Sequence, residues 1–130
     1  MSATKPGQVI EKFIEYFNAG DLDGLVHDLY EDGAVLTAIP GAAAASGKAA
    51  IREALQAFIA LGGKMTLVKG AIFENGDIAL THNRWRIDVP GRDALGGSTA
   101  EVVRRQADGS WKYVIDNPWG SAWLDTPPQA

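Results

Sequence analysis

Residues 18–36 read NAGDLDGLVHDLYEDGAVL, and residues 46–55 read SGKAAIREAL. The first stretch predicts that a helix ends at Gly20, because glycine readily adopts the left-handed conformation that closes a helix. Asp21 is a favourable N-cap, so a second, short helix is predicted to follow at once. A strand is predicted over residues 33–39, and the second stretch predicts a third helix. This succession of elements determines the fold.

Apolar side chains recur at helical spacing in all three predicted helices. In the first helix they are Val9, Ile10, Phe13, Ile14 and Phe17. In the second they are Leu22, Leu25, Val26 and Leu29, and in the third they are Ile51, Leu55, Phe58 and Ile59. Each helix therefore has one apolar face, and the first two are expected to form a hairpin.

The chain after Lys64 has the character of consecutive strands. Asn-Gly at 75–76 and Asp-Gly at 108–109 are strong hairpin turns. The strands predicted around these turns and the loop at 90–97 cover residues 65–73, 78–89, 98–106 and 111–119. Helices followed by a meander predict an α+β fold. The length predicts a single domain over residues 1–130, with residues 1–5 and 124–130 as flexible ends.

Composition and charge narrow the functional classes. A formal net charge of −4 and a pI near 5.0 argue against nucleic-acid binding, which needs a basic surface. The chain has no cysteine, which excludes disulfides and thiolate chemistry. No apolar run reaches the roughly 20 residues of a transmembrane helix, and the N-terminus lacks a signal-peptide pattern. We therefore expect a cytoplasmic protein that does not bind membranes.

Two stretches carry a resemblance to a known family. One is the opening stretch quoted above, and the other is residues 101–120, which read EVVRRQADGSWKYVIDNPWG. Together they resemble the SnoaL-like and ketosteroid isomerase-like branch of the nuclear transport factor 2-like superfamily, over residues 8–120. The resemblance implies a curved, mainly antiparallel sheet around a cone-shaped cavity that helices close. It also implies a homodimer formed through the open face of the sheet.

The resemblance indicates where a ketosteroid isomerase would keep its catalytic groups. Its oxyanion-binding tyrosine falls at Phe13, its general base at Thr37 and its second carboxyl near Glu101. Phenylalanine cannot donate a hydrogen bond, and threonine is not a base near neutral pH, so two of the three roles are vacant. Tyr16, one helical turn from Phe13, is a candidate to supply the missing hydroxyl.

Strand alternation separates the side chains that face the cavity from those that face outward. The predicted cavity residues are Phe13, Phe17, Thr37, Thr81, Asn83, Trp85, Val103, Ile115, Asn117 and Trp119, together with Glu101 and Tyr16. Apolar walls with a few polar groups are typical of a small-molecule site, so we expect a small apolar or aromatic ligand. The open face is predicted to carry Leu80, His82, Arg84, Arg86, Val102, Arg104 and Gln106.

Glu101 is the strongest catalytic candidate, because a carboxyl in an apolar pocket can donate or accept a proton. The alternative is a salt bridge across the sheet, to Arg84, Arg104 or Arg105. Asp116 could serve as a base in a limonene epoxide hydrolase-like scheme. Alternation instead places Asp116 on the outer face, where it would hold the turn at Pro118.

The remaining aromatic and histidine residues have two interpretations each. Trp85 and Trp119 either stack on a flat ligand or pack the core. His82 could be a base but is expected on the outer face, and His27 on the surface. These two histidines lack the close spacing of a zinc site, and residues 41–48 have the wrong spacing for a phosphate loop. We therefore predict no metal and no cofactor.

Two functions are compatible with the sequence. The first is an enzyme, namely an isomerase, cyclase, hydrolase or dehydratase that uses a cavity carboxylate. The second is a non-catalytic ligand-binding or assembly domain, which the vacant positions Phe13 and Thr37 favour.

Overall fold

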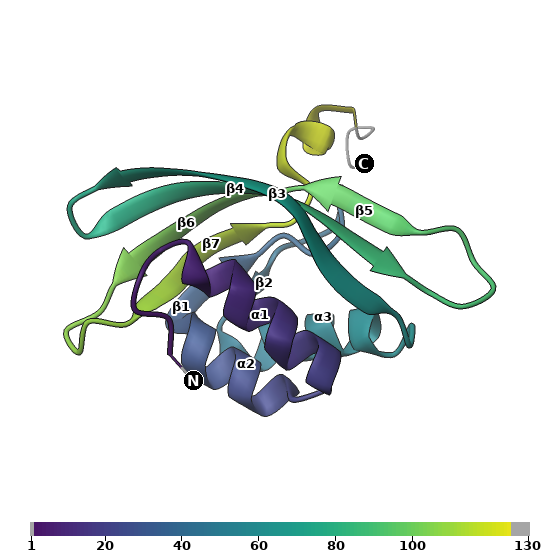
Figure 1. The fold of residues 1–130 in the computed structure, drawn as a ribbon, viewed down its shortest axis with the longest axis horizontal. Helices are drawn as coiled ribbons and strands as arrows, with labels where there is room; N and C mark the ends of the chain where they lie inside the picture. The colour runs from purple at the N-terminus through teal and green to yellow at the C-terminus, as the bar shows by residue number, and fades with distance from the viewer. Residues whose placement is uncertain (1, 126–130) are drawn as a thin grey trace.

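The chain begins with helices and ends mainly with strands, as the sequence predicts (Figure 1). The computed structural model describes residues 2–125. Within this range the helices are α1 (Gln8–Ala19), α2 (Leu22–Leu29) and α3 (Lys48–Ile59), with a 3₁₀ helix η1 (Gly120–Asp125). The strands are β1 (Tyr30–Leu36), β2 (Ala45–Ser46), β3 (Lys64–Asn75), β4 (Ile78–Asp88), β5 (Leu95–Ser98), β6 (Ala100–Arg105) and β7 (Trp111–Asn117). Residues 1 and 126–130 of the predicted flexible ends lie outside the described part.

In the described part of the chain, seven strands form one sheet in the order β2-β1-β7-β6-β4-β3, with β5 paired to β4. The β1–β7 pair is parallel and the other pairs are antiparallel. The sheet arches over the helices, so that α1, α2 and α3 lie on its inner side (Figure 1). The predicted α+β fold is therefore confirmed, with its core between the sheet and the helices.

Local signals set the junction between α1 and α2. Gly20 has a φ of 71°, the left-handed conformation, and its N–H donates to the Phe17 carbonyl at 3.1 Å. Asp21 Oδ1 accepts a hydrogen bond from Gly24 N at 2.9 Å and so caps α2. The helical hairpin therefore forms where the sequence predicts it.

A β-bulge in β7 changes which of its side chains face inward. Val102 pairs with Ile115, but the next residue of β6 pairs with Tyr113, so β7 carries an extra residue at position 114. An extra residue interrupts the alternation of a strand. Tyr113 and Asp116 are consequently both buried, at 1% and 4% exposure, whereas Ile115 is 44% exposed. Contrary to the alternation argument, Ile115 faces outward and Asp116 faces inward.

Three further segments differ from the prediction. β1 begins at Tyr30 rather than at Gly33, and Leu95–Ser98 forms a strand inside the predicted loop. Ala3 lies in the predicted flexible start, yet it is buried and its carbonyl accepts a hydrogen bond from Trp111 N at 2.8 Å. Among residues 2–125, no helix combines the length and the apolar content that crossing a membrane requires.

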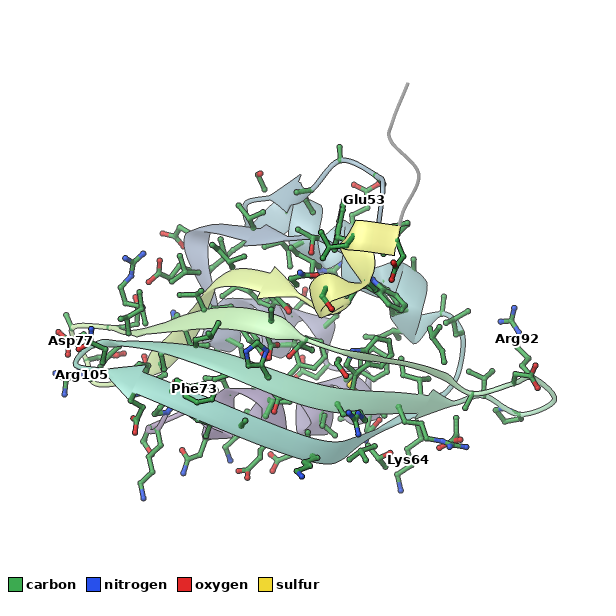
Figure 2. The ribbon with its side chains drawn as sticks, turned by 90° about the horizontal axis from the view of Figure 1, so that it is seen from above. Glu53, Lys64, Phe73, Asp77, Arg92 and Arg105 are labelled. Atoms are coloured by element: carbon green, nitrogen blue, oxygen red, sulfur yellow. The ribbon has the colours of Figure 1, made fainter. Side chains whose placement is uncertain are left out.

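The outer face of the sheet carries exposed apolar side chains. In Figure 2, β3, β4 and β6 face the viewer and the three α-helices lie behind them. On this face Phe73 pairs with Leu80, Leu80 with Val102, and Val102 with Ile115. Phe73, Leu80 and Ile115 are 61%, 41% and 44% exposed. We call these four side chains, which cross β3, β4, β6 and β7, the apolar row.

Candidate functional site

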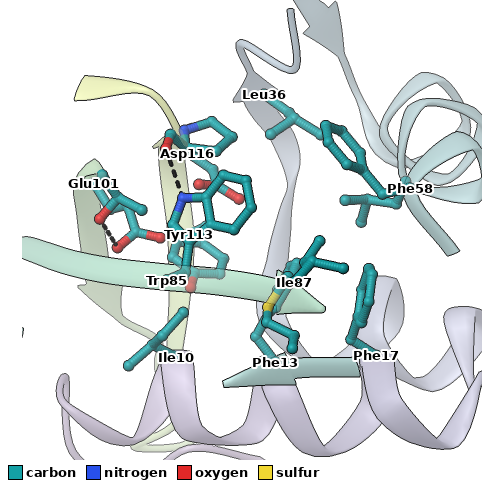
Figure 3. Close-up of a pocket in the computed structure, with 14 residues that line it drawn as sticks. Ile10, Phe13, Phe17, Leu36, Phe58, Trp85, Ile87, Glu101, Tyr113 and Asp116 are labelled. Atoms are coloured by element: carbon teal, nitrogen blue, oxygen red, sulfur yellow. Dashed lines mark hydrogen bonds between the residues drawn. The ribbon is translucent and has the colours of Figure 1, made fainter. Parts of the chain in front are cut away.

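Two carboxyl side chains are buried on the inner face of the sheet. Glu101 lies in β6 and Asp116 in β7, and the two residues are direct register partners. Paired residues of neighbouring strands point to the same side of a sheet, and both side chains line one pocket (Figure 3). Their exposed fractions are only 2% and 4%. Buried carboxyls are rare, so this pair identifies the candidate site.

Three donors bind a single oxygen of Glu101. From β4, Thr81 Oγ1 donates to Glu101 Oε1 at 3.1 Å and Asn83 Nδ2 donates to it at 2.7 Å. Thr99, the residue just before β6, donates to the same oxygen at 2.7 Å and accepts from Asn83 N at 2.8 Å. All three of these hydrogen bonds fall on Oε1, and the side chains of Asp116 and Tyr113 also interact with the Glu101 carboxyl.

Asp116 has a different environment from that of Glu101. The Tyr30 hydroxyl, at the start of β1, donates a hydrogen bond to Asp116 Oδ2. Burial raises the pKa of Asp116 well above its usual range, the negative charge of Glu101 raises it further, and the Tyr30 hydrogen bond acts in the opposite direction. Two adjacent buried carboxyls resist double ionisation. The pair is therefore suited to share one proton.

Tyr113 lies beside both carboxyls. Its ring centroid is 5.0 Å from that of Tyr30 and 6.3 Å from that of Phe13. Burial raises the pKa of Tyr113 well above its usual range, and the charges of Glu101 and Asp116 add to this effect. The Tyr113 hydroxyl is buried, yet it has no hydrogen-bond partner among the described residues. Because an unsatisfied buried hydroxyl is costly, this group is available to a ligand.

The pocket that the two carboxyls share is apolar and small. Besides Thr99, Glu101, Tyr113 and Asp116, it is lined by Ile10, Phe13, Phe17, Leu36, Leu55, Phe58, Met65, Trp85, Ile87 and Pro118 (Figure 3). A water-sized sphere can enter about 40 Å³ of it. This is space for water rather than for a drug-sized ligand. We call it the inner pocket.

A second, larger cavity lies on the other side of Tyr113. It is formed between residues 5–11 and the inner face of β3 and β4, and its volume is about 730 Å³. Thr81, Asn83 and Tyr113 provide its polar floor. Ile10 and Tyr113 line both cavities and so mark the boundary between them. We call this cavity the outer cleft.

The structure brings several of the predicted site residues together. Those that line the inner pocket are Phe13, Phe17, Trp85 and Glu101. Those that line the outer cleft are Thr81 and Asn83. Val103 is fully buried but lines neither cavity. The hydroxyl and amide groups of β4 thus lie between the two cavities and hold Glu101.

Other predicted site residues make structural contacts instead. Thr37 Oγ1 donates to Asn117 Oδ1 at 3.0 Å, and Trp119 Nε1 donates to a backbone carbonyl after β1 at 2.6 Å. The Tyr16 hydroxyl donates to Asp28 of α2. Burial raises the pKa of Tyr16 to about 12, and the Asp28 hydrogen bond contributes to the increase. None of Thr37, Asn117, Trp119 and Tyr16 lines either cavity.

The alternative role of Glu101, a salt bridge across the sheet, does not form within residues 2–125. Arg104 pairs with Glu31 at 2.7 Å, and Arg105 pairs with Asp77. His82 is exposed, and its Nδ1 lies 2.9 Å from the Thr99 carbonyl oxygen. In the same range, no group of three or more histidine and acidic side chains is placed to hold a metal ion.

Sequence reasoning missed three residues of the site, Tyr30, Thr99 and Tyr113, and placed Asp116 on the wrong face. Tyr30 precedes the predicted start of its strand, and Thr99 lies between two strands. The bulge in β7 leaves one sign in the sequence. Residues 113–115 are three consecutive apolar side chains, and such a run agrees with a bulge that interrupts the pleat.

Comparison of the sequence with models of known protein families identifies the family of this chain. The family model of the SnoaL-like domain matches residues 10–114, which is most of the chain. None of the curated proteins matches the sequence.

Comparisons with solved structures agree on the fold. A nuclear transport factor 2-like protein of unknown function from Pseudomonas putida is 23% identical, with a TM-score of 0.71 over 85% of this chain and 80% of that one. A candidate dehydratase of the same superfamily from Streptomyces avermitilis is 18% identical, with a TM-score of 0.68 over 85% and 90%. A candidate scytalone dehydratase from Novosphingobium aromaticivorans is 16% identical, with a TM-score of 0.69 over 85% and 78%. Identities this low show the fold alone.

Proposed function

The chain belongs to the SnoaL-like domain family, and on this basis we propose that it catalyses proton transfer on a small, neutral, apolar or aromatic molecule, as an isomerase or a dehydratase. The observation that carries the proposal is the pairing of Glu101 with Asp116. They are buried register partners that line one apolar pocket. Such a pair supplies an acid and a base in one site.

The environments of the two carboxyls assign their roles. Three hydrogen bonds to Oε1 fix the orientation of the Glu101 carboxyl, and we assign its other oxygen, Oε2, as the base. Asp116 has a raised pKa, caused mainly by burial and by the charge of Glu101, and therefore holds the proton. Glu101 is accordingly the general base and Asp116 the general acid.

Both reactions begin with the same step. Glu101 Oε2 removes a proton from a carbon next to a carbonyl group, and the C–H electron pair forms a carbon–carbon double bond. In a dehydration, Asp116 gives its proton to a hydroxyl on the next carbon, which leaves as water with the electrons of its C–O bond. In an isomerisation of a β,γ-unsaturated ketone, the C–H electron pair forms the α,β double bond, and the electron pair of the β,γ double bond takes a proton from the protonated Glu101 at the γ carbon. Two structures of similar fold carry dehydratase names, which supports the first outcome.

Deuterium exchange tests the proposal without knowledge of the natural substrate. The protein is incubated in D₂O with β-hydroxy ketones and β,γ-unsaturated ketones that carry one phenyl ring, and proton NMR follows loss of the α-proton signal, loss of water and double-bond migration. The wild type is expected to accelerate at least one of these. Glu101→Gln is expected to lower that rate by about 100-fold or more, which is typical for removal of a general base.

The matched control is Glu53→Gln, the same chemical change at an exposed carboxylate of α3 (Figure 2). This variant should keep the wild-type rate. If Glu101→Gln keeps every turnover that the wild type shows, Glu101 is not the base and the proposal is wrong.

A non-catalytic ligand-binding domain is the second candidate. Phe13 and Thr37 occupy the positions where the related isomerases have a hydroxyl donor and a base, and Thr37 is already bonded to Asn117. On this alternative, Glu101→Gln would change ligand affinity while no compound is converted. The exchange experiment separates the two, because only an enzyme accelerates α-proton loss.

We also propose that the protein forms a homodimer through the outer face of the sheet. The apolar row offers contiguous exposed apolar surface, which monomeric proteins rarely leave uncovered. Acidic and basic groups flank it, including the bidentate pair of Arg104 with Glu31. A surface with both charges can match a second copy of itself in a two-fold interface.

A further inference from the structure

The outer cleft is large enough to bind a small molecule. Its volume of about 730 Å³ falls in the range of ligand sites, roughly 300–1,000 Å³. The inner pocket, with about 40 Å³, does not. A ligand of more than a few atoms therefore fits the outer cleft and not the inner pocket. Neither carboxyl lines the outer cleft, but Tyr113, which interacts with both of them, forms part of its floor.

One wall of the outer cleft is apolar and partly exposed. Leu67 and Ile72 of β3 pair with Trp85 and Thr81, which are buried on the inner face of the sheet. Because register partners point to the same side, Leu67 and Ile72 also face inward. They are nevertheless 38% and 47% exposed, although the end of the Ile72 side chain lies close to Gly7, the N-cap of α1. A partly exposed, inward-facing apolar wall suits an apolar ligand.

The floor of the outer cleft offers one free donor and one free acceptor. The donor is the Tyr113 hydroxyl, which has no partner in the described chain. The hydroxyl is buried, so a ligand gains this hydrogen bond only through a small displacement of the side chains around it. The acceptor is Asn83 Oδ1, because Asn83 uses Nδ2 for Glu101 and no described residue donates to Oδ1. Opposite Asn83 stands Gly70, where a first side-chain carbon would lie 2.6 Å from Oδ1. Glycine at this position therefore keeps the oxygen reachable.

We propose that the outer cleft binds the substrate, and that the substrate is a neutral, elongated apolar molecule with a hydroxyl or carbonyl group at one end. Its apolar body lies on Leu67 and Ile72. Its terminal oxygen accepts a hydrogen bond from Tyr113, and a terminal hydroxyl also donates to Asn83. This orientation directs the polar end towards Glu101. Binding of such a molecule in the outer cleft does not depend on the proposed function. Only the identification of this molecule as the substrate rests on the proposed function.

The charges at the rim agree with a neutral ligand. Lys5, Glu11 and Glu74 all line the outer cleft, and their excess of one negative charge opposes an anionic ligand. The selection of one ligand over another therefore comes from the apolar wall and from the two polar atoms of the floor.

Binding of 2-naphthol, a neutral aromatic alcohol, tests the site directly. Amide chemical shifts of the full-length protein are followed by NMR during a titration, and the affinity is measured by fluorescence. The expected shifts cluster at Leu67, Ile72 and Tyr113. Ile72→Trp fills the cleft and should weaken binding at least tenfold. The matched control is Ile78→Trp, the same chemical change on the outer face of β4 outside the apolar row, where Ile78 is 41% exposed, and it should not change the affinity.

Naphthalene, which lacks the hydroxyl, tests the polar contact. Tyr113→Phe should weaken binding of 2-naphthol about tenfold and leave binding of naphthalene unchanged. A general loss of structure would instead weaken both compounds alike. The proposal is overturned if 2-naphthol does not bind, if the shifts cluster at Phe17, Leu55 and Phe58 of the inner pocket, or if Ile72→Trp binds as the wild type does.

The two proposals fail in distinguishable ways. If 2-naphthol binds in the outer cleft but no ketone is converted, the cleft is a binding site and the enzymatic proposal is wrong. The other outcome is that the wild type converts a ketone, that Glu101→Gln abolishes this conversion, and that Ile72→Trp converts the ketone with the wild-type kcat/KM. In that case the enzymatic proposal stands and the outer cleft is not the substrate site.

Discussion

Tyr30 and Tyr113 lie side by side, with ring centroids 5.0 Å apart, and in the described chain only the Tyr30 hydroxyl has a hydrogen-bond partner. Tyr30 donates to Asp116, whereas Tyr113 donates to no described residue. Two tyrosines of nearly equal burial thus have different relations to the same carboxyl pair. Tyr30 thus holds Asp116 in place, whereas the Tyr113 hydroxyl is the group that we propose for ligand binding.

This difference predicts opposite effects of removing the two hydroxyls. Tyr30→Phe should lower the free energy of unfolding by about 1–3 kcal/mol, because Asp116 Oδ2 loses its donor in a buried site. Tyr113→Phe should instead raise it, by up to about 1 kcal/mol, because no hydrogen bond is lost and an unsatisfied buried hydroxyl is removed. Urea unfolding followed by tryptophan fluorescence measures both. Equal losses in the two variants would contradict the assignment of the hydrogen bond.

Glu101→Gln should lower the pKa of Asp116. Burial is the main cause of the raised Asp116 pKa, and the charge of Glu101 adds to it, so a neutral amide removes that second contribution. Glutamine keeps an oxygen at the position that accepts the three hydrogen bonds, which preserves the local structure. Carbon-13 NMR of the Asp116 carboxyl gives the value, with Glu53→Gln as the variant that should leave it unchanged.

Asp116 should make the protein less stable as the pH rises. The raised pKa of folded Asp116, caused first by burial, exceeds the ordinary value of 3.8 expected for the unfolded chain. Between these two values the folded state binds a proton that the unfolded state has released, so the free energy of unfolding falls with increasing pH. One group contributes at most about 1.4 kcal/mol per pH unit.

Asp116→Asn removes this titration and should become more stable relative to the wild type as the pH rises above 4. Urea unfolding of both proteins between pH 4 and pH 8 measures the difference. Asparagine still offers an oxygen to the Tyr30 hydroxyl, so the comparison isolates the charge. Parallel stability curves for the two proteins would show that Asp116 titrates normally.

The apolar row predicts the effect of a charge on the quaternary structure. Leu80→Lys places an ammonium group at its centre, where Leu80 is 41% exposed and pairs with both Phe73 and Val102. The wild type is expected to be a dimer by light scattering, and Leu80→Lys a monomer. Ala57→Lys, on the exposed side of α3, should remain dimeric. A monomeric wild type would remove the proposal of a homodimer through this face.

The fold was predictable because its signals are local. Gly20 and Asp21 mark the helical junction through their own conformational and capping preferences. The Asn-Gly pair at 75–76 marks the β3–β4 hairpin through the turn that it favours. None of these needs a distant contact, and each element they delimit is present in the structure.

Part of the site was also predictable, through the regular pleat of β4. Thr81, Asn83 and Trp85 are all buried on the inner face, as simple alternation requires. The inward orientation of Glu101 was predictable for the same reason, because the side chains of β6 alternate regularly at the position where Glu101 pairs with Asp116. Where a strand is regular, the sequence alone tells which side chains enter the interior.

The rest of the site depends on tertiary structure. The extra residue at position 114 is a feature of the pairing of β7 with β6, and it turns Asp116 inward and Ile115 outward. The Tyr30 contact with Asp116 joins residues far apart in the chain. The sequence by itself therefore determined the elements and one carboxyl, because capping, turn formation and alternation act over a few residues. Only the tertiary structure decided the second carboxyl and the outer cleft, because strand register and helix packing arise from contacts between distant segments.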